Sequence, residues 1–182
     1  MSIEESGITL NFPDSNFFRF QDCQGYTNIQ ENFKEMDVCW YDVKNDILYV
    51  IELKDWGNGI LSEEKDPSYS SEDISKLKKN ISKSRIEVLF KKSLDSVCMF
   101  LSIILNKPYS VNIQNCAPFK VTNTTKIKLL SIINWIDTDT SYISTVHSAY
   151  KTYFKPYGKL FGIQSYVVMT KNQAIKSYPW IK

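Results

Sequence analysis

Two strand-like segments joined by a short turn constrain the fold of this chain more than any other feature. Residues 37–43 (DVCWYDV) and 47–54 (ILYVIELK) are rich in β-branched and aromatic residues. Residues 44–46 (KND) between them are turn formers, and residues 55–59 (DWGNG) are expected to end the second segment. The pattern predicts an antiparallel β-hairpin.

Charged residues interrupt the second strand on one face only. Strand side chains alternate between faces, so Glu52 and Lys54 point the same way. A turn centred on residues 44–45 places Asp37 opposite Glu52, whereas a turn centred on residues 45–46 places Asp37 opposite Lys54. In either register the three side chains converge, because facing Cβ atoms lie about 4.5–5.5 Å apart.

Two carboxylates at this separation repel each other unless a positive charge lies between them. Mg²⁺ or Mn²⁺ suits the position, since Mg²⁺ is commonly held by one or two carboxylates, waters and phosphate oxygens. The backbone carbonyl of Leu53 is a further candidate ligand. Lys54 would position a metal-bound water or offset phosphate charge. Such a site fits the hydrolysis of a phosphodiester bond.

The order of these residues resembles the PD-(D/E)XK nuclease superfamily, which has the restriction-endonuclease-like fold. The resemblance rests on Asp37, followed fifteen positions later by Glu52-Leu53-Lys54 on the second strand. It implies that Asp37 and Glu52 are metal ligands and that Lys54 is the catalytic base or positions the water.

Many members of that superfamily add a glutamate from an early helix. Glu4, Glu5 and Glu31 are candidates, and Glu31 is nearest in sequence to Asp37. The chain departs from the pattern at Met36, where the superfamily name has proline. It also has no histidine before Asp37, a residue that viral RNA-cutting members often carry. We therefore expect DNA rather than RNA as the substrate.

The remaining pattern predicts one α/β domain over residues 1–182, with a mixed central sheet flanked by helices. This agrees with the fold that the resemblance implies. A helix is expected from Ser71, with a break near Ser93 and a second, apolar helix ended by Asn106 and Pro108. The other expected elements are a short strand at 16–21, a helical turn or loop at 28–35, a loop at 62–70, a buried strand at 126–135, a helix at 141–154 and a strand at 162–170. Residues 111–121 are ambiguous.

Charge is divided unevenly along the chain. Residues 1–75 hold 16 acidic and five basic residues, whereas residues 76–182 hold 17 basic and four acidic residues. This asymmetry points to a polyanionic partner or to ordinary surface variation. Five basic residues on the predicted helix are candidate phosphate contacts, although a solvated helix face explains them equally well: Lys76, Lys78, Lys79, Lys83 and Arg85.

Other features exclude competing classes. The four cysteines are far apart without metal-site spacing, so we expect reduced thiols and a cytoplasmic protein. No apolar run approaches the ~20 residues that span a bilayer, so no membrane association is expected. His147 is the single histidine, and we expect it to be structural because no nucleophile motif accompanies it. Tyr150 and Tyr153 are expected in the core, on the apolar side of the helix at 141–154.

The sequence thus predicts a metal-dependent endonuclease, with Mg²⁺ or Mn²⁺ as cofactor and nucleic acid, favoured as DNA, as substrate. Double-strand cutting by this fold usually needs two active sites, which implies a homodimer. Three alternatives stay open. One is a catalytically silent nucleic-acid- or protein-binding module on the same fold. The second is a plain α/β interaction domain. In the third, Lys54 guards a solvated sheet edge.

Overall fold

A computed structural model of the chain describes residues 2–57, 68, 70–136 and 140–182. The strands are β1 (Ser2–Glu5), β2 (Ile8–Asn11), β3 (Phe17–Phe18), β4 (Val38–Asp42), β5 (Ile47–Asp55), β6 (Lys126–Asn134) and β7 (Ser165–Thr170). The helices are η1 (Phe20–Asp22), α1 (Gln24–Thr27), α2 (Ser71–Ile104), η3 (Pro108–Ser110), α3 (Val111–Gln114), α4 (Ser141–Leu160) and α5 (Lys171–Ser177).

The larger sheet is mixed and has the strand order β3-β4-β5-β6-β7. β4 runs antiparallel to both β3 and β5, whereas β6 runs parallel to β5 and β7 parallel to β6. Parallel neighbours need a crossover connection, and α2 and α4 supply the two crossovers. The predicted hairpin, the buried strand at 126–135 and the α/β class are therefore confirmed.

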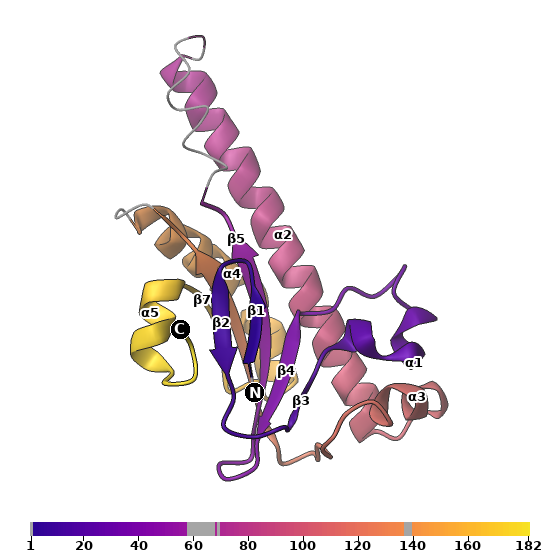
Figure 1. The fold of residues 1–182 in the computed structure, drawn as a ribbon. Helices are drawn as coiled ribbons and strands as arrows, with labels where there is room; N and C mark the ends of the chain where they lie inside the picture. Colours follow the sequence, from indigo (N-terminus) through magenta and orange to yellow (C-terminus); the bar gives the residue numbers. More distant parts are fainter. Residues whose placement is uncertain (1, 58–67, 69, 137–139) are drawn as a thin grey trace.

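Three layers build the domain (Figure 1). α2 and α4 cover one face of the sheet, and the β1–β2 hairpin with α5 covers the other. Along β5, Leu48 and Val50 enter the core beneath α2 and α4, whereas Ile51 and Leu53 enter the core on the opposite face. Burial on both faces explains why this strand is an almost continuous apolar run.

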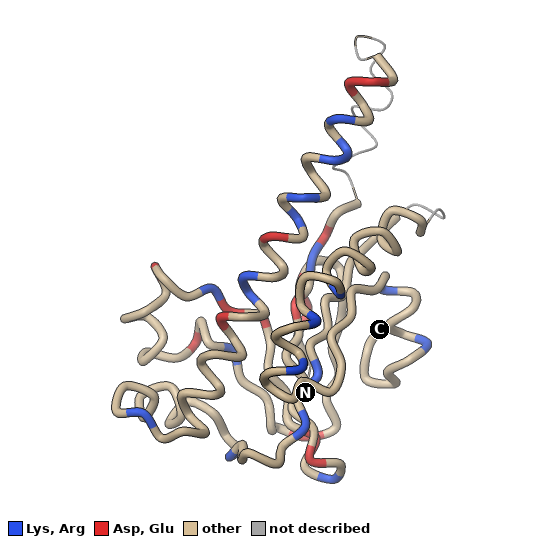
Figure 2. The backbone as a smooth tube through the Cα atoms, turned by 180° about the vertical axis from the view of Figure 1, so that it is seen from behind, with Lys and Arg blue, Asp and Glu red and all other residues tan. Residues whose placement is uncertain are grey.

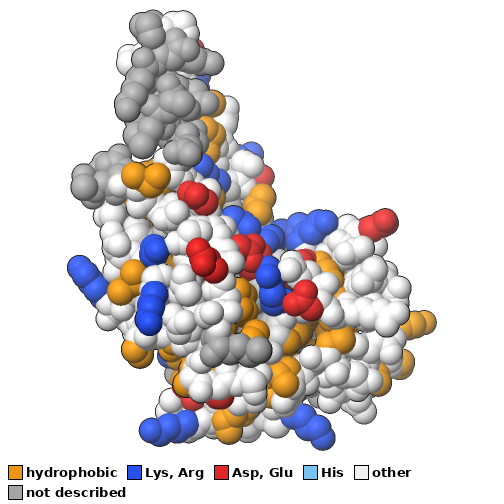
Figure 3. All heavy atoms as spheres, in the orientation of Figure 1, with side chains coloured by type: hydrophobic (Ala, Val, Ile, Leu, Met, Phe, Trp, Pro, Cys, Tyr) orange, Lys and Arg blue, Asp and Glu red, His pale blue; other side chains and the backbone are white. Residues whose placement is uncertain are grey.

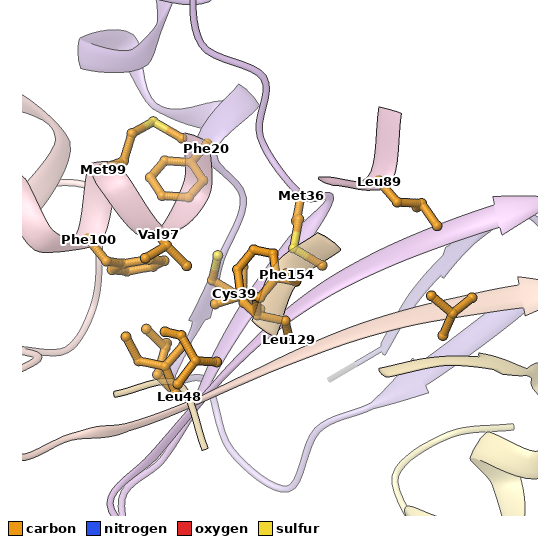
Figure 4. Close-up of a cluster of buried hydrophobic side chains, with 14 of the residues drawn as sticks. Phe20, Met36, Cys39, Leu48, Leu89, Val97, Met99, Phe100, Leu129 and Phe154 are labelled. Carbon is orange, nitrogen blue, oxygen red and sulfur yellow. The ribbon is translucent and has the colours of Figure 1, made fainter. Parts of the chain in front are cut away.

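The core beneath α2 and α4 is well filled (Figure 4). Phe100 of α2, Phe154 of α4 and Leu129 of β6 are almost fully buried there, together with Met36 and Cys39 from the segment leading into and along β4. Met36 donates its backbone N–H to Ser96 Oγ of α2 at 2.9 Å. α2 is thereby fixed directly against the residue that precedes Asp37.

α2 is one continuous helix of 34 residues, so the predicted break near Ser93 is wrong. Ser93 is fully buried, and its hydroxyl donates to the Leu89 carbonyl and contacts the Tyr150 hydroxyl at 2.7 Å. These contacts satisfy a polar side chain that would otherwise interrupt a buried helix. The start is close to the prediction, with Ser70 as N-cap in a capping box.

The N-terminal part of α2 extends beyond the sheet in Figure 1. Its C-terminal end matches the prediction, because Asn106 adopts a positive φ of 52° and Pro108 begins η3. In the described part of the chain, no helix combines the length and the hydropathy needed to cross a membrane.

Other elements agree with the sequence in part. The predicted helix at 141–154 continues to Leu160, and the predicted strand at 162–170 begins at Ser165. Tyr150 is fully buried as expected, but Tyr153 is 61% exposed, which contradicts its assignment to the core. The predicted loop at 62–70 lies outside the described residues except for residues 68 and 70.

Cys23 and Cys116 form a disulfide bond, so the prediction of four reduced thiols is wrong for this pair. Cys23 immediately precedes α1, and Cys116 lies just after α3. A Cβ atom built on Gly25 would come within 2.6 Å of the Asn112 backbone, which shows how closely the two short helices approach. Cys39 and Cys98 are free.

Candidate metal and phosphodiester site

The hairpin register brings Asp37 opposite Glu52. Val38 pairs with Ile51 and Cys39 with Val50, which is the first of the two registers considered from the sequence. Asp37 directly precedes β4, and its Oδ2 accepts a hydrogen bond of 2.7 Å from the Leu53 backbone N–H. Asp37 is thereby fixed to the strand that carries the other two candidate residues.

β5 is a central strand, with β4 and β6 on its two sides. The alternative in which Lys54 guards a sheet edge is therefore wrong. Glu52 is fully buried, whereas the side chains of Asp37 and Lys54 are 11% and 31% exposed. The Lys54 ammonium lies 2.8 Å from Glu52 Oε1 and 3.8 Å from Asp37 Oδ2. The three predicted residues form one cluster, open to solvent mainly at Lys54.

Lys92 of α2 completes the cluster, and the sequence did not identify it. Its ammonium lies 2.7 Å from Glu52 Oε1 and donates to Asp37 Oδ1 at 3.3 Å. The only signal in the sequence is a lysine directly before the predicted break at Ser93, and helical periodicity alone does not reveal its partners. The described site therefore pairs two carboxylates with two ammonium groups.

The buried position of Glu52 changes its acidity. The pKa of Glu52 is raised from 4.5 to about 7, first by burial and then by the nearby charge of Asp37, while Lys92 and Lys54 act in the opposite direction. Burial by itself lowers the pKa of Lys92, but attraction to Glu52 and Asp37 outweighs this and leaves that pKa raised. The cluster thus favours a protonated Lys92 and holds Glu52 near its titration point at neutral pH.

The carboxylate oxygens suit a divalent cation. Glu52 Oε1 is contacted by the Lys92 and Lys54 ammonium groups at 2.7 and 2.8 Å, whereas Oε2 has no partner among the described residues. A buried carboxylate oxygen without a hydrogen bond is costly unless a cation or water meets it. Asp37 and Glu52 are the side chains that could hold such a cation. In the described part of the chain no group of three Asp, Glu, His or Cys side chains gathers.

The Leu53 carbonyl, the other proposed ligand, accepts a hydrogen bond of 3.2 Å from Ser6 Oγ. This contact comes from the turn between β1 and β2, which the sequence did not connect with the site. A carbonyl oxygen has two lone pairs, so one acceptor position is still available.

The early glutamates lie around the cluster rather than in it. Glu31 lines a cavity of ≈ 390 Å³ together with Lys92 and four further residues: Tyr26, Gln30, Lys34 and Glu35. Glu5 pairs with Arg19 at 2.5 Å, and Arg19 Nε also donates to the Asp37 carbonyl at 3.2 Å. Glu4 lies on β1. Glu5 therefore contributes to the site indirectly, by orienting the arginine that supports the Asp37 backbone.

The predicted phosphate contacts all lie on α2. Figure 2 shows basic residues spread along this helix with acidic residues among them. Lys76 and Lys83 are exposed and pair with glutamates one helical turn away, at 2.8 and 3.9 Å. Lys79 is also exposed, and Lys78 is half-buried. Acidic and basic side chains also lie beside each other near the middle of the face in Figure 3.

Arg85 differs from these lysines. Its guanidinium lies 4.5 Å from the centre of the Trp56 ring and donates to the Tyr142 hydroxyl at 3.2 Å. These contacts tie α2 to the end of β5 and to the start of α4. Trp56 is buried and packs in the core beneath α2 and α4.

His147 has the structural role expected from the sequence. Its Nδ1 accepts a hydrogen bond of 3.0 Å from the Val168 backbone N–H of β7. Burial lowers its pKa, and Lys151 lowers it further. The neutral imidazole thereby accepts the hydrogen bond of a backbone N–H on β7, which is an edge strand of the sheet.

Comparison with known proteins gives no match to a protein-family model, to a curated protein or to a solved structure.

Proposed function

We propose that this protein is a metal-dependent nuclease that hydrolyses phosphodiester bonds of nucleic acid. The observation that carries the proposal is the pairing of Asp37 with the fully buried Glu52, whose Oε2 has no partner among the described residues while its Oε1 contacts the ammonium groups of Lys54 and Lys92. Lys54 projects from the same face of β5 and reaches solvent. A structural ion pair alone does not explain why Glu52 Oε2 is buried without a partner beside a second carboxylate.

The chain order of the elements supports a restriction-endonuclease-like fold. The antiparallel strands β3, β4 and β5 are followed by α2 and then by β6, parallel to β5. The resemblance implies a core with the chain order helix, three strands, helix and strand. The elements from β3 to β6 follow this order, with Asp37 directly before β4 and Glu52 and Lys54 on β5. The first helix of that core has no counterpart among the described residues before β3.

In this proposal Asp37 and Glu52 hold Mg²⁺ or Mn²⁺. When bound, the cation lowers the pKa of a water molecule and stabilises the charge that develops on the phosphate. Lys54 orients that water and offsets the charge of the non-bridging oxygens. The water oxygen forms the new bond to phosphorus and releases one proton to solvent, while the bond to the leaving oxygen breaks and that oxygen takes up a proton from solvent.

The substrate in this proposal is DNA, as the resemblance favours. The exposed lysines of α2 supply salt-dependent contacts to the phosphate backbone. Cleavage of both strands would require two copies of the site and hence a homodimer.

The alternative is a binding module on the same fold without catalysis. The two ammonium groups beside Asp37 and Glu52 favour this alternative, because they already neutralise the carboxylates in the absence of a metal. The two functions differ in whether a metal ion and a phosphodiester reach the site.

Cleavage of labelled single- and double-stranded DNA and RNA tests the proposal. The reactions contain Mg²⁺, Mn²⁺ or EDTA, with the wild-type protein beside D37N and K54M. We expect metal-dependent cleavage that falls at least about 100-fold in both variants, since each removes a group that stabilises charge in the transition state. K44M is the matched control, because Lys44 is an exposed lysine in the turn between β4 and β5, outside both the cluster and the candidate phosphate contacts on α2. Folded wild-type protein that cuts none of the four substrates with either metal would refute the proposal.

A further inference from the structure

Lys92 lies where a cation bridging the two carboxylates would be expected. Its ammonium contacts Asp37 Oδ1 at 3.3 Å and Glu52 Oε1 at 2.7 Å. Lys54 contacts the same glutamate oxygen but lies 3.8 Å from the nearer oxygen of Asp37. Lys92 is therefore the closer bridge between the carboxylates that the proposed function assigns to a metal.

A divalent cation and both ammonium groups cannot all remain within contact of one carboxylate pair, because the positive charges repel one another. Lys92 is less exposed than Lys54, with 19% against 31% of the side chain accessible. It is also anchored on the continuous helix α2, so a change of its position must come from side-chain rotation.

The structure offers Lys92 a second position. The cavity of ≈ 390 Å³ next to the cluster is lined by Lys92 itself, by the carboxylates of Glu31 and Glu35, and by Tyr26, Gln30 and Lys34; the Tyr26 hydroxyl also donates to Glu35. The flexible four-carbon side chain can change rotamer without movement of the helix. In the cavity the ammonium would exchange one pair of carboxylates for another, so the charge would not be left without partners.

We infer that Lys92 is a displaceable internal cation that regulates metal binding. In the metal-free protein it bridges Asp37 and Glu52, and when a divalent cation binds there it rotates into the cavity toward Glu31 and Glu35. This inference rests on the proposed function for the identity of the metal site. It adds that the protein sets its metal affinity through competition with its own lysine.

Metal binding measured by calorimetry tests the inference without reference to cleavage. Mn²⁺ is titrated into the wild-type protein, into K92M and into the control K91M. Lys91 is the neighbouring residue on α2 and pairs with Asp95, outside the cluster. We expect K92M to bind Mn²⁺ at least about tenfold more tightly than wild type, because no ammonium has to be displaced. K91M should equal wild type, and E52Q should abolish binding in the K92M background.

Lysine acetylation of the wild-type protein provides a test that does not depend on the folding of K92M. Brief treatment with acetic anhydride, with and without saturating Mn²⁺, is followed by mass spectrometry of the peptides. Displacement from the carboxylates should increase the labelling of Lys92 at least about threefold. The exposed Lys83, which already reacts freely, should not change.

The outcomes separate this inference from the proposed function. Metal-dependent cleavage with unchanged or weaker Mn²⁺ binding in K92M would refute the exchange and leave the nuclease proposal intact. Tight binding only in K92M would support the lysine as a competitor and count against metal-dependent cleavage by the wild type. Labelling of Lys92 that stays constant while Mn²⁺ binds would overturn the inference, as would a lack of Mn²⁺ binding in every variant.

Discussion

Replacing Glu52 with glutamine should stabilise the metal-free protein at neutral and alkaline pH. The carboxyl is fully buried, and its pKa is raised from 4.5 to about 7 by burial and then by the charge of Asp37. Lys92 and Lys54 oppose this rise without cancelling it. The other titratable group near Glu52 is Tyr150 of α4, whose own pKa is raised mainly by burial.

The sign and the size follow from linkage between protonation and folding. The folded protein holds the Glu52 proton more tightly than the unfolded chain, so stability is greatest below pH 4.5 and falls as the pH rises to about 7. The difference of about 2.5 pH units corresponds to about 3 kcal/mol. Glutamine is similar in size and does not ionise. E52Q should therefore match wild type near pH 4 and exceed it by about 3 kcal/mol at pH 8, or about 6–12 °C in Tm.

Urea denaturation in EDTA, followed by circular dichroism at several pH values between 4 and 8, measures this difference. The control is E87Q, because Glu87 is an exposed glutamate on α2 that pairs with Lys83. Its effect should stay within about 0.5 kcal/mol at every pH. If E52Q is less stable than wild type at pH 8, or if its advantage does not depend on pH, the reasoning about the buried charge is wrong.

Three further predictions concern the rest of the fold. Phe100→Ala should lower the free energy of unfolding by about 3–5 kcal/mol in urea denaturation, because it opens a cavity in the core beneath α2; a loss below about 1 kcal/mol would contradict that packing. Joint replacement of Cys23 and Cys116 by alanine should lower it by about 2–4 kcal/mol, because the disulfide closes a loop with a sequence separation of 93. Treatment of the wild type with dithiothreitol should lower the free energy of unfolding by the same amount. A wild-type stability that does not change with the reductant would argue against the disulfide bond. The pKa of His147 is lowered from 6.5, mainly by burial. The contribution of the neutral imidazole to the free energy of unfolding is therefore complete above pH 6.5 and is lost as the pH falls below that value. The stability advantage of wild type over His147→Asn should therefore shrink below pH 6.5, and a constant advantage would show that the bond from the Val168 N–H does not depend on the neutral imidazole.

The regions that the sequence predicted well are those in which local pattern and burial agree. The run at 47–54 has strand-forming residues throughout, and β5 forms there because both of its faces are covered. The helix at 141–154 follows one apolar side, and Tyr150, which the sequence predicts in the core, is fully buried next to Phe154. Tyr153 is the exception, since it lies one position beyond the buried side and faces the groove between α2 and α4.

The break expected at Ser93 was wrong for a different reason. A serine in a helical pattern gives no information about which distant group will meet its hydroxyl. In this fold Tyr150, 57 positions further along the chain, lies beside it. The contact allows α2 to remain helical through a buried polar position.

The sequence by itself determined the convergence of Asp37, Glu52 and Lys54, because alternation along a strand and a short turn place these residues on one patch in either register. The tertiary structure decided which register forms, and it made β5 a central strand in which Glu52 loses contact with water. It also brought Lys92 to the carboxylates and Cys23 to Cys116, over 55 and 93 positions of sequence. Such pairings depend on how α2 crosses the sheet and where α3 packs against α1. The periodicity of apolar residues predicts which side of a helix or strand is buried, but it does not predict which residues of other elements that side contacts.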